Sequence, residues 1–536
     1  MRQTTHDVVI IGAGHNGLVC ASYLAAAGLR VKMVERRAVV GGAAVTEEFY
    51  PGFRNSLAAY TVSLLAPKVI RDLDLYGHGL RIVERPIANF WPLDEARYLK
   101  LPFGLANIKA EFARFSPRDA KAYAGYAAAL ERGADILRRL ILKAPPNVGG
   151  GLADIVRAVG LGRLLSRLDL EEKRLLLDLF TKSAADFLAP WFETPAIKAA
   201  FAFDGIVGFY ASPYTPGSAY VLLHHGFGEV NGKKGVWGHA IGGMGAVSQA
   251  MAKVAARRGV DIALNAPVAE VIVEKGRAAG VVLEDGAVVR ARAVAANVNP
   301  KLLFGKLVDR ALLPSDFARR MDHWKCGSGT LRMNVALSEL PDFTCLPGKT
   351  AAAHHGAGIV IGPTLDYLDR AHADARRYGW SRQPVIEMLV PSTLDASLAP
   401  EGAHVASLFC QHFAPTLPDG ASWDEAREAA ADCVIETVNA YAPNFKASVI
   451  ARQVLTPLDL ERVLGLVGGD IFHGQLTLDQ MFAARPMLGH ADYRAPIPGL
   501  YLCGSGTHPG GGVTGAPGHN AARRIIADFR WRRSSY

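Results

Sequence analysis

The 536-residue chain has only six cysteines, and no two of them are close in sequence. Neither a Cys-x-x-Cys pair nor a metal-ligand spacing occurs, so structural disulfides, a redox dithiol and a metal site are not expected. The chain also lacks the run of about 18 apolar residues that a membrane-crossing helix requires. A predicted strand begins within the first ten residues, which leaves no room for a secretory leader. These absences favour a cytoplasmic protein.

A strong charge excess is missing as well. The net charge of +9 is moderate for this length, and basic residues gather only at Arg530, Arg532 and Arg533. Such a tail is usually solvated, so no nucleic-acid partner is expected. Hydrophobic residues make up 50% of the chain and charged residues 20%, an ordinary globular balance. The length is sufficient for two sizeable cores.

The N-terminal residues have the pattern of a β-α-β unit. Residues 7–11 are a short apolar run typical of a buried parallel strand, and residues 15–27 form an Ala/Leu-rich helical pattern. Residues 29–35 predict a second strand. This order is the first unit of a dinucleotide-binding fold.

The turn between this strand and helix reads Gly12-Ala13-Gly14-His15-Asn16-Gly17. Gly12 permits a tight turn, Gly14 lets a pyrophosphate approach the backbone, and Gly17 lets the helix pack closely on the strand. The helix N-terminus then offers unpaired N–H groups to the phosphates. Glu35 ends the second strand, where an acidic residue binds the ribose hydroxyls. We therefore predict a dinucleotide site.

Two further glycine-rich segments favour FAD over a nicotinamide cofactor. The first is Gly41-Gly42-Ala43, directly after the acidic residue, where the backbone can approach the cofactor a second time. The second follows an apolar strand at residues 500–503 and precedes a helix near residue 518. Its N–H groups suit the ribityl chain and pyrimidine end of a flavin. The residues expected to bind there are Gly504, Ser505, Gly512, Val513 and Thr514.

The pattern in the rest of the chain predicts a discontinuous arrangement. Helical patterns dominate residues 85–237, as in 117–143 and 170–192, and then β-rich runs at 261–264, 268–274, 279–283 and 288–295 read as an antiparallel meander. We predict an α/β protein with a Rossmann-like FAD-binding domain of the glutathione-reductase or amine-oxidase type. This domain would comprise residues 1–85, 238–330 and 486–536. An α+β substrate domain would comprise residues 86–237 and 331–485.

Six sequence blocks, spread over nearly the whole length, resemble one known family. They are residues 10–19, 212–217, 223–225, 242–246, 471–474 and 501–506. The chain resembles the phytoene desaturase-like FAD-dependent oxidoreductases, part of a larger group that includes the monoamine oxidases. The resemblance implies that the backbone of Val268 contacts the adenine. Many phytoene desaturases carry Gly-Gly-Arg after the acidic residue, whereas this chain has Ala43 at the position of the arginine. The resemblance then leaves Arg36 as the arginine that would contact the phosphates.

Three residues are candidates for the proton acceptor of a flavin reaction: His225, Glu229 and His473. The resemblance implies that their segments lie on the substrate side of the cofactor, and histidine accepts a proton near neutral pH. Two alternatives stay open. In one, each of the three candidates only forms hydrogen bonds with the loop backbone. In the other, a zinc ion is held by His224, His225, Glu229 and His239.

The expected reaction is transfer of a hydride from a C–H or C–N–H group of a largely apolar small molecule to FAD. Oxygen or a quinone would then reoxidise the flavin. Two alternatives are an amine oxidase and a flavin-binding regulatory protein that acts through partners without turnover.

Residues 152–170 combine apolar side chains with Arg157, Arg163 and Arg167 at helical spacing. A basic amphipathic helix of this kind can lie in a membrane interface, or it can cap a core. A peripheral membrane contact is therefore one of two expectations for this segment.

Overall fold

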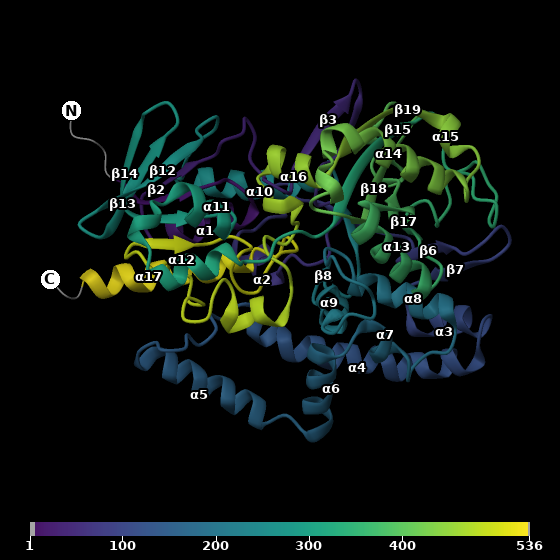
Figure 1. Ribbon diagram of the computed structural model, residues 1–536, viewed down its shortest axis with the longest axis horizontal. Helices are drawn as coiled ribbons and strands as arrows, with labels where there is room; N and C mark the ends of the chain where they lie inside the picture. Colours follow the sequence, from purple (N-terminus) through teal and green to yellow (C-terminus); the bar gives the residue numbers. More distant parts are fainter. Residues whose placement is uncertain (1–5, 534–536) are drawn as a thin grey trace.

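The computed structural model of the chain describes residues 6–533, and two seven-stranded sheets lie side by side in that part (Figure 1). The first sheet is built around β1 (His6–Ile11), which pairs in parallel with β2 (Val31–Val34) and β14 (Val288–Ala296). Parallel pairing continues outward to β11 (Asp261–Ala263) and β20 (Leu500–Leu502). The carboxyl ends of these strands therefore share one edge.

Side chains of β1 alternate between two hydrophobic cores, as the period of a strand requires. Val8 and Ile10 pack into a core shared with α1 (His15–Ala26), α10 (Met244–Arg257) and α17 (Ala516–Arg533). Val9 and Ile11 pack into a second core, with the antiparallel strands and residues 303–324. Both faces of the parallel sheet are thus covered, which explains the unbroken apolar run in the sequence.

The predicted four-strand meander is wrong in one strand. Strands β12 (Val268–Glu274), β13 (Arg277–Leu283) and β14 do form an antiparallel ribbon, but β11 leaves it and pairs in parallel with β2. The connection through α10 carries the chain to the far edge of the sheet, where Lys32 forms an ion pair with Asp261 at 2.7 Å. Strand β14 is long enough to serve both parts, since its first half pairs with β13 and its second half with β1 and β20.

The second sheet has the strand order β19-β15-β18-β17-β16-β6-β7. Only β16 and β6 pair in parallel, so this sheet is mixed. Helices α13 (Leu365–Tyr378) and α14 (Trp423–Asn439) contact β17. The strands are β6 (Asn89–Pro92), β7 (Tyr98–Leu101), β15 (Thr330–Leu337), β16 (Gly358–Ile361), β17 (Trp380–Leu389), β18 (His404–Phe413) and β19 (Val449–Leu455).

A helical layer lies along the lower side of the molecule in Figure 1. Its helices are α3 (Leu105–Ala113), α4 (Pro117–Ile141), α5 (Leu152–Ser166), α6 (Leu170–Thr181), α7 (Ala184–Leu188), α8 (Pro195–Ala202) and α9 (Ser218–His224). The continuous helical pattern expected for residues 170–192 is broken after Thr181. The break occurs because Ser183 caps a new helix, its hydroxyl accepting from the N–H of Asp186 at 3.0 Å. In the described part of the chain, no helix combines the length and the apolar character needed to cross a bilayer.

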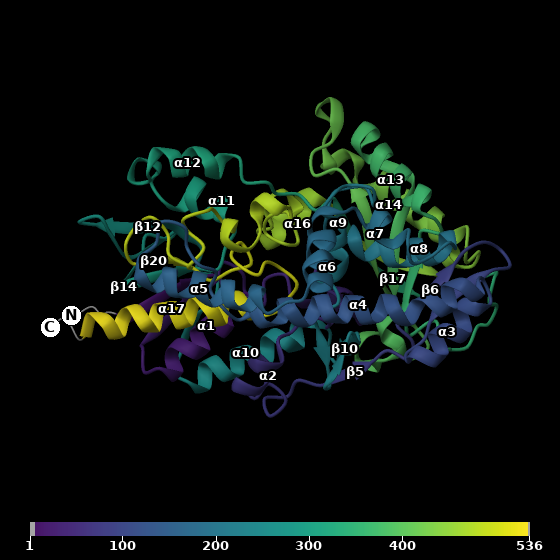
Figure 2. The same ribbon diagram turned by 90° about the horizontal axis from the view of Figure 1, so that it is seen from below.

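Short elements connect the layers. They are β3 (Thr46–Tyr50), β4 (Phe53–Ser56), α2 (Pro67–Asp72), β5 (Ile82–Glu84), β8 (Glu229–Val230), β9 (Lys233–Lys234), β10 (Gly238–Ala240), α11 (Pro300–Leu302), α12 (Ser315–Asp322), α15 (Phe445–Ser448) and α16 (Pro457–Leu464). In the view from below, α5 and α17 overlap at the left, and α4 runs from the centre toward the right (Figure 2). Strand β15 begins at Thr330, one residue before the predicted boundary between the two domains. The division into domains itself stays a prediction.

Candidate functional site

The glycine turn places the N-terminus of α1 at the carboxyl edge of the first sheet. Gly12 has a φ of +91°, which favours glycine, and Gly14 is the N-cap without any side-chain capping bond. A Cβ on Gly17 would lie 2.4 Å from the carbonyl oxygen of Gly12, so the helix can approach the turn only with glycine there. The first-turn N–H groups and the positive end of the helix dipole are left for an anionic ligand.

Glu35 is held in place by the backbone around it. Its Oε2 accepts from the N–H of Ala13 at 2.7 Å and its Oε1 from the N–H of Arg37 at 2.9 Å. The residue is buried, yet each carboxylate oxygen keeps a free lone pair for a hydroxyl donor. This fixed carboxylate has the chemistry required to bind ribose.

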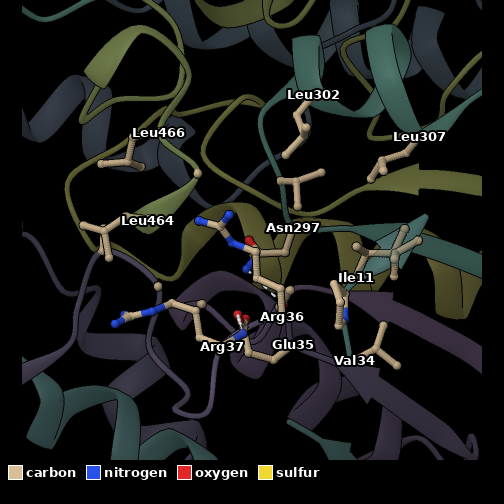
Figure 3. A pocket seen from close by; sticks show the side chains of 18 of the residues that line it. Ile11, Val34, Glu35, Arg36, Arg37, Asn297, Leu302, Leu307, Leu464 and Leu466 are labelled. Atoms are coloured by element: carbon tan, nitrogen blue, oxygen red, sulfur yellow. Dashed lines mark hydrogen bonds between the residues drawn. The ribbon is translucent and has the colours of Figure 1, made fainter. Parts of the chain in front are cut away.

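A cavity runs from Glu35 past the glycine turn, and Figure 3 shows part of its wall. At one end Val34, Ala266, Pro267 and Val268 form an apolar slot. At the other end the wall is made by Gly42, Ala43, His15, His473 and Ser505. Its length joins the Glu35 carboxylate to Ser505 of the C-terminal glycine loop.

Four buried polar atoms at this cavity have no hydrogen-bond partner among the described residues. They are His15 Nε2, Asn16 Oδ1, Arg37 Nη1 and His473 Nδ1. Buried polar atoms are rarely left unpaired, so their concentration here indicates a polar ligand that completes them. A cofactor with phosphates, ribose hydroxyls and a heteroaromatic ring fits both these atoms and the glycine turn, and the residues present therefore suit FAD.

A second cavity meets the first at His15, Ala43, His473 and Ser505. Its wall is largely apolar and aromatic, and no carboxylate lines it. The other lining residues are Ala58, Ala59, Tyr60, Thr61, Ser63, Leu64, Val207, His225, Trp237, Ile471, Phe472, Gly512 and Val513. This cavity can hold a largely apolar molecule against one end of a ligand in the first.

Charged groups lie behind the aromatic wall of the second cavity. The Tyr60 hydroxyl donates to Glu387 at 2.5 Å, while Arg85 lies 3.7 Å from the same carboxylate and over the ring of Trp237. Burial raises the pKa of Asp204, close to this group, to about 8, with a further contribution from Glu387. Arg332 lies over the ring of Tyr60. Both rings therefore already contact a guanidinium group.

One buried arginine fixes the loop that carries Phe472 and His473. Arg485 donates to the carbonyl oxygens of Phe472 at 2.8 Å and Ser505 at 2.9 Å, and it also reaches those of Gly474, Gln475 and Gln480. It thereby joins the loop to the C-terminal glycine loop. Asp470 anchors the same loop by accepting from the N–H groups of Gly327 and Phe472.

The histidines at the junction are neutral at physiological pH. Burial lowers the pKa of His15 to about 3, with a further contribution from His473. Burial, with a smaller contribution from Arg485, lowers the pKa of His473 to about 4. Burial also lowers the pKa of His225 to about 4, and its Nδ1 contacts the carbonyl oxygen of Val221 at 2.9 Å. Among the described residues, His473 Nδ1 and His15 Nε2 are buried without a partner, whereas His225 Nδ1 has one.

The structure brings together most of the residues expected at the site. Those that line one or both cavities are Gly12, Gly14, His15, Asn16, Glu35, Arg36, Gly42, Ala43, Val268, Ser505, Gly512, Val513, His225 and His473. The residues that line neither cavity are Gly17, Gly41, Gly504 and Thr514. The Thr514 hydroxyl accepts from the N–H of Ala516 in α17. Glu229 lies in the β8–β9 hairpin and lines neither cavity.

Four contributors to the site were not expected from the sequence. Asn297 follows β14 and donates to the carbonyl oxygen of Gly12 at 3.2 Å, and a polar residue ending a buried strand was an available signal. Arg37 lines the cavity with an unpartnered Nη1, whereas Arg36 is engaged by the last carbonyls of α16. Tyr60 and Trp237 come from loops, and no sequence pattern marks either.

Comparison with known proteins now defines the family. Residues 17–330 match the model of the family described as flavin containing amine oxidoreductase. The chain belongs to this family. It is also 42% identical to "Pyridine nucleotide-disulfide oxidoreductase domain-containing protein 2" of Rattus norvegicus, over 98% of this chain and 94% of that protein. A phytoene desaturase (lycopene-forming) of Pseudescherichia vulneris is 26% identical over 97% of this chain and 99% of its own.

Among solved structures, putrescine oxidase bound to putrescine has the same fold. The TM-score is 0.60 with 18% identity, covering 99% of this chain and 100% of that one. The predicted fold class and the predicted family resemblance are confirmed, with the phytoene desaturases as more distant relatives. As a member of the flavin-containing amine oxidoreductase family, the chain is an oxidoreductase and its cofactor is FAD.

Proposed function

We propose that the protein is a dehydrogenase or desaturase that transfers a hydride from a largely apolar organic substrate to FAD, with oxygen or a quinone as final electron acceptor. The observation that carries this proposal is the second cavity, which is apolar, has no lining carboxylate and meets the cofactor cavity at His15, His473 and Ser505. A relative is named for the desaturation of phytoene, which supports a substrate of this class.

The roles of the residues follow from their positions. Leu64, Val207 and Phe472 would bury the substrate and exclude water from the reacting carbon. When bound, FAD supplies the hydride acceptor. Loss of a hydride leaves a proton to be removed, and His473 lies where the two cavities meet with a free, neutral Nδ1. We therefore propose His473 as the proton acceptor in preference to His225 and Glu229.

Oxidation of an amine is the second candidate, because the family description includes amine oxidoreductases. Tyr60 and Trp237 could provide an aromatic enclosure for an amine. A cationic amine is disfavoured by the guanidinium groups already lying over these rings and by the lack of a lining carboxylate. A flavin-binding protein that acts only through partners is the third candidate.

Anaerobic reduction of the FAD-loaded protein distinguishes these candidates. We expect an uncharged monoterpene hydrocarbon to bleach the flavin absorbance faster than benzylamine at equal concentration, because the cavity lacks an anion to pair with an ammonium. NADH serves as a control donor. Faster reduction by benzylamine would favour the amine oxidase, and a flavin that no organic donor reduces would favour the binding role.

Replacement of His473 tests the proposed proton acceptor. The His473→Gln variant should keep its FAD content but reduce its flavin more slowly by roughly a hundredfold or more, the contribution of a positioned base. In the parent protein the rate should fall only as the pH approaches 4, because the pKa of His473 is lowered to about 4 and the neutral form is the base. The exposed His323→Gln is the matched control. Equal rates for His473→Gln, His225→Gln, Glu229→Gln and the parent would refute a protein base among the three.

We also propose that α5 makes the peripheral membrane contact. Four apolar side chains of α5 are largely exposed: Leu152 at 82%, Ile155 at 56%, Val156 at 70% and Val159 at 49%. Exposed apolar side chains on one stretch of a helix, with Arg163 and Arg167 near its end, suit an interfacial helix.

Sedimentation with anionic vesicles tests this contact. The variant Leu152→Ser/Val156→Ser should bind roughly tenfold or more weakly, since each buried apolar side chain contributes about 1.5–3 kcal/mol. Leu312→Ser/Leu478→Ser removes two exposed leucines elsewhere and is the control. If both variants sediment like the parent, α5 does not touch the membrane.

A further inference from the structure

A groove is lined by residues of α5, of α17 and of the segment 140–146. Figure 2 shows α5 and α17 at the end of the molecule away from the second sheet. The inner face of α5 contributes Leu161 and Leu164 to the groove, and Phe482 contributes from the loop before β20. These side chains form an apolar floor. The groove shares no lining residue with the two cavities of the flavin site.

The charged side chains that line this groove are all basic. Lys143, Arg157, Arg523 and Arg524 line it, and no acidic residue within residues 6–533 does. Arg157 is paired with Asp154 at 2.5 Å, but the described part of the chain offers no ion pair to Lys143 or Arg523. Basic side chains outnumber their carboxylate partners here, and like charges repel one another unless an anion joins them.

Arg524 gives an independent indication of a ligand. Its side chain is 10% exposed, and its Nε is buried without a partner among the described residues. Its nearest carboxylate, on Asp492, is 3.7 Å away. Burial and the neighbouring Arg157 lower the pKa of Arg524, and the carboxylates of Asp492 and Asp528 offset this only in part. A planar guanidinium with a free N–H suits a phosphate oxygen.

The groove also adjoins the exposed apolar face of α5. Leu161 and Leu164 point into the groove, whereas Leu152, Val156 and Val159 lie exposed on the same helix. A helix that is apolar on its outer side and borders a basic groove on its inner side would meet both regions of a bilayer. The outer side suits acyl chains, and the groove suits the headgroup layer.

We propose that the groove between α5 and α17 binds the phosphate headgroup of an anionic membrane lipid. This inference rests on the proposed membrane contact of α5 and adds the residues that select the lipid. Lys143, Arg523 and Arg524 pair with the phosphate, and the apolar floor receives the start of an acyl chain.

Vesicle sedimentation with two compositions tests the proposal on the FAD-loaded full chain. The parent should bind vesicles that contain phosphatidylglycerol and should bind pure phosphatidylcholine far more weakly. Lys143→Glu/Arg523→Glu should weaken binding to the anionic vesicles by roughly twentyfold or more, since each basic residue near an anionic surface contributes about fivefold. Both residues are exposed, so the change leaves the fold intact. The variant Arg524→Gln, which keeps the aliphatic stem but removes the guanidinium group, should also weaken this binding.

Lys109→Glu/Arg377→Glu makes the same change in net charge at exposed sites on α3 and α13, and this control should bind like the parent. If the control and the groove variant lose the same amount of binding to anionic vesicles, net charge alone explains the loss and the proposed site is wrong. If Leu152→Ser/Val156→Ser loses vesicle binding but the groove variants do not, α5 contacts the membrane and the groove does not bind the lipid. Binding of glycerol 3-phosphate by a parent protein that does not sediment with the anionic vesicles would show a site for soluble phosphate and overturn the lipid.

Discussion

The Gly14→Val variant is expected to fold and to purify without FAD. Gly14 is the N-cap of α1, and a Cβ there would lie 2.9 Å from the amide Nδ2 of Asn297, inside the cofactor cavity. The valine methyl groups would extend further into the space that the pyrophosphate requires. We expect the ratio of flavin absorbance to protein absorbance to fall below about one tenth of the parent value, because a clash of more than about 1.4 kcal/mol weakens binding tenfold.

Gly348→Val is the matched control, since a Cβ at Gly348 would meet no heavy atom within 4 Å and its φ is not positive. This variant should keep its FAD and its far-UV circular dichroism spectrum. The Gly14→Val spectrum should also match the parent, which separates loss of cofactor from loss of fold. A fully loaded yellow Gly14→Val protein would show that the pyrophosphate lies elsewhere.

The second large effect is expected on stability, at Arg485. This side chain is fully buried and donates to five different backbone carbonyls around the loop that carries His473. Arg485→Met would leave these carbonyls without their donor, and each unsatisfied buried group costs about 1–3 kcal/mol. We expect the free energy of unfolding in urea to fall by at least about 3–5 kcal/mol, the cost of breaking a buried charged network.

Arg485→Lys keeps the charge but can reach fewer carbonyls. Its free energy of unfolding should therefore lie between those of the parent and Arg485→Met. Arg377→Met removes an exposed arginine and should change stability by less than about 0.5 kcal/mol. If Arg485→Met unfolds at the same urea concentration as Arg377→Met, Arg485 does not hold the two loops together.

The parts of the site that could be predicted are those set by local sequence. Gly12, Gly14 and Glu35 lie within one β-α-β unit, where spacing alone fixes which atoms face the ligand. The C-terminal loop with Ser505 was predicted for the same reason, since an apolar strand delivers it to the carboxyl edge of the sheet. The confirmed fold class and FAD depend on these two units.

Residues contributed by distant segments could not be predicted. Tyr60 and Trp237 both line the second cavity although they lie far apart in the sequence, and the hydrogen-bond acceptor of Tyr60, Glu387, comes from β17. The assignment of β11 failed because short β-rich runs do not reveal which edge of a sheet they join. Arg36 and Arg37 are adjacent in sequence, and only tertiary contacts with α16 and Glu47 show that their roles differ.

A crystal structure of the FAD-loaded protein tests the central claim most directly. The account predicts the adenine in the apolar slot at Val34, Pro267 and Val268, and the isoalloxazine ring where the two cavities meet, between His15, His473 and Ser505. One face of the ring should border the cavity that contains Phe472. Density for the isoalloxazine ring beside Glu35, or outside the junction of the two cavities, would contradict both the proposed site of hydride transfer and the role of His473.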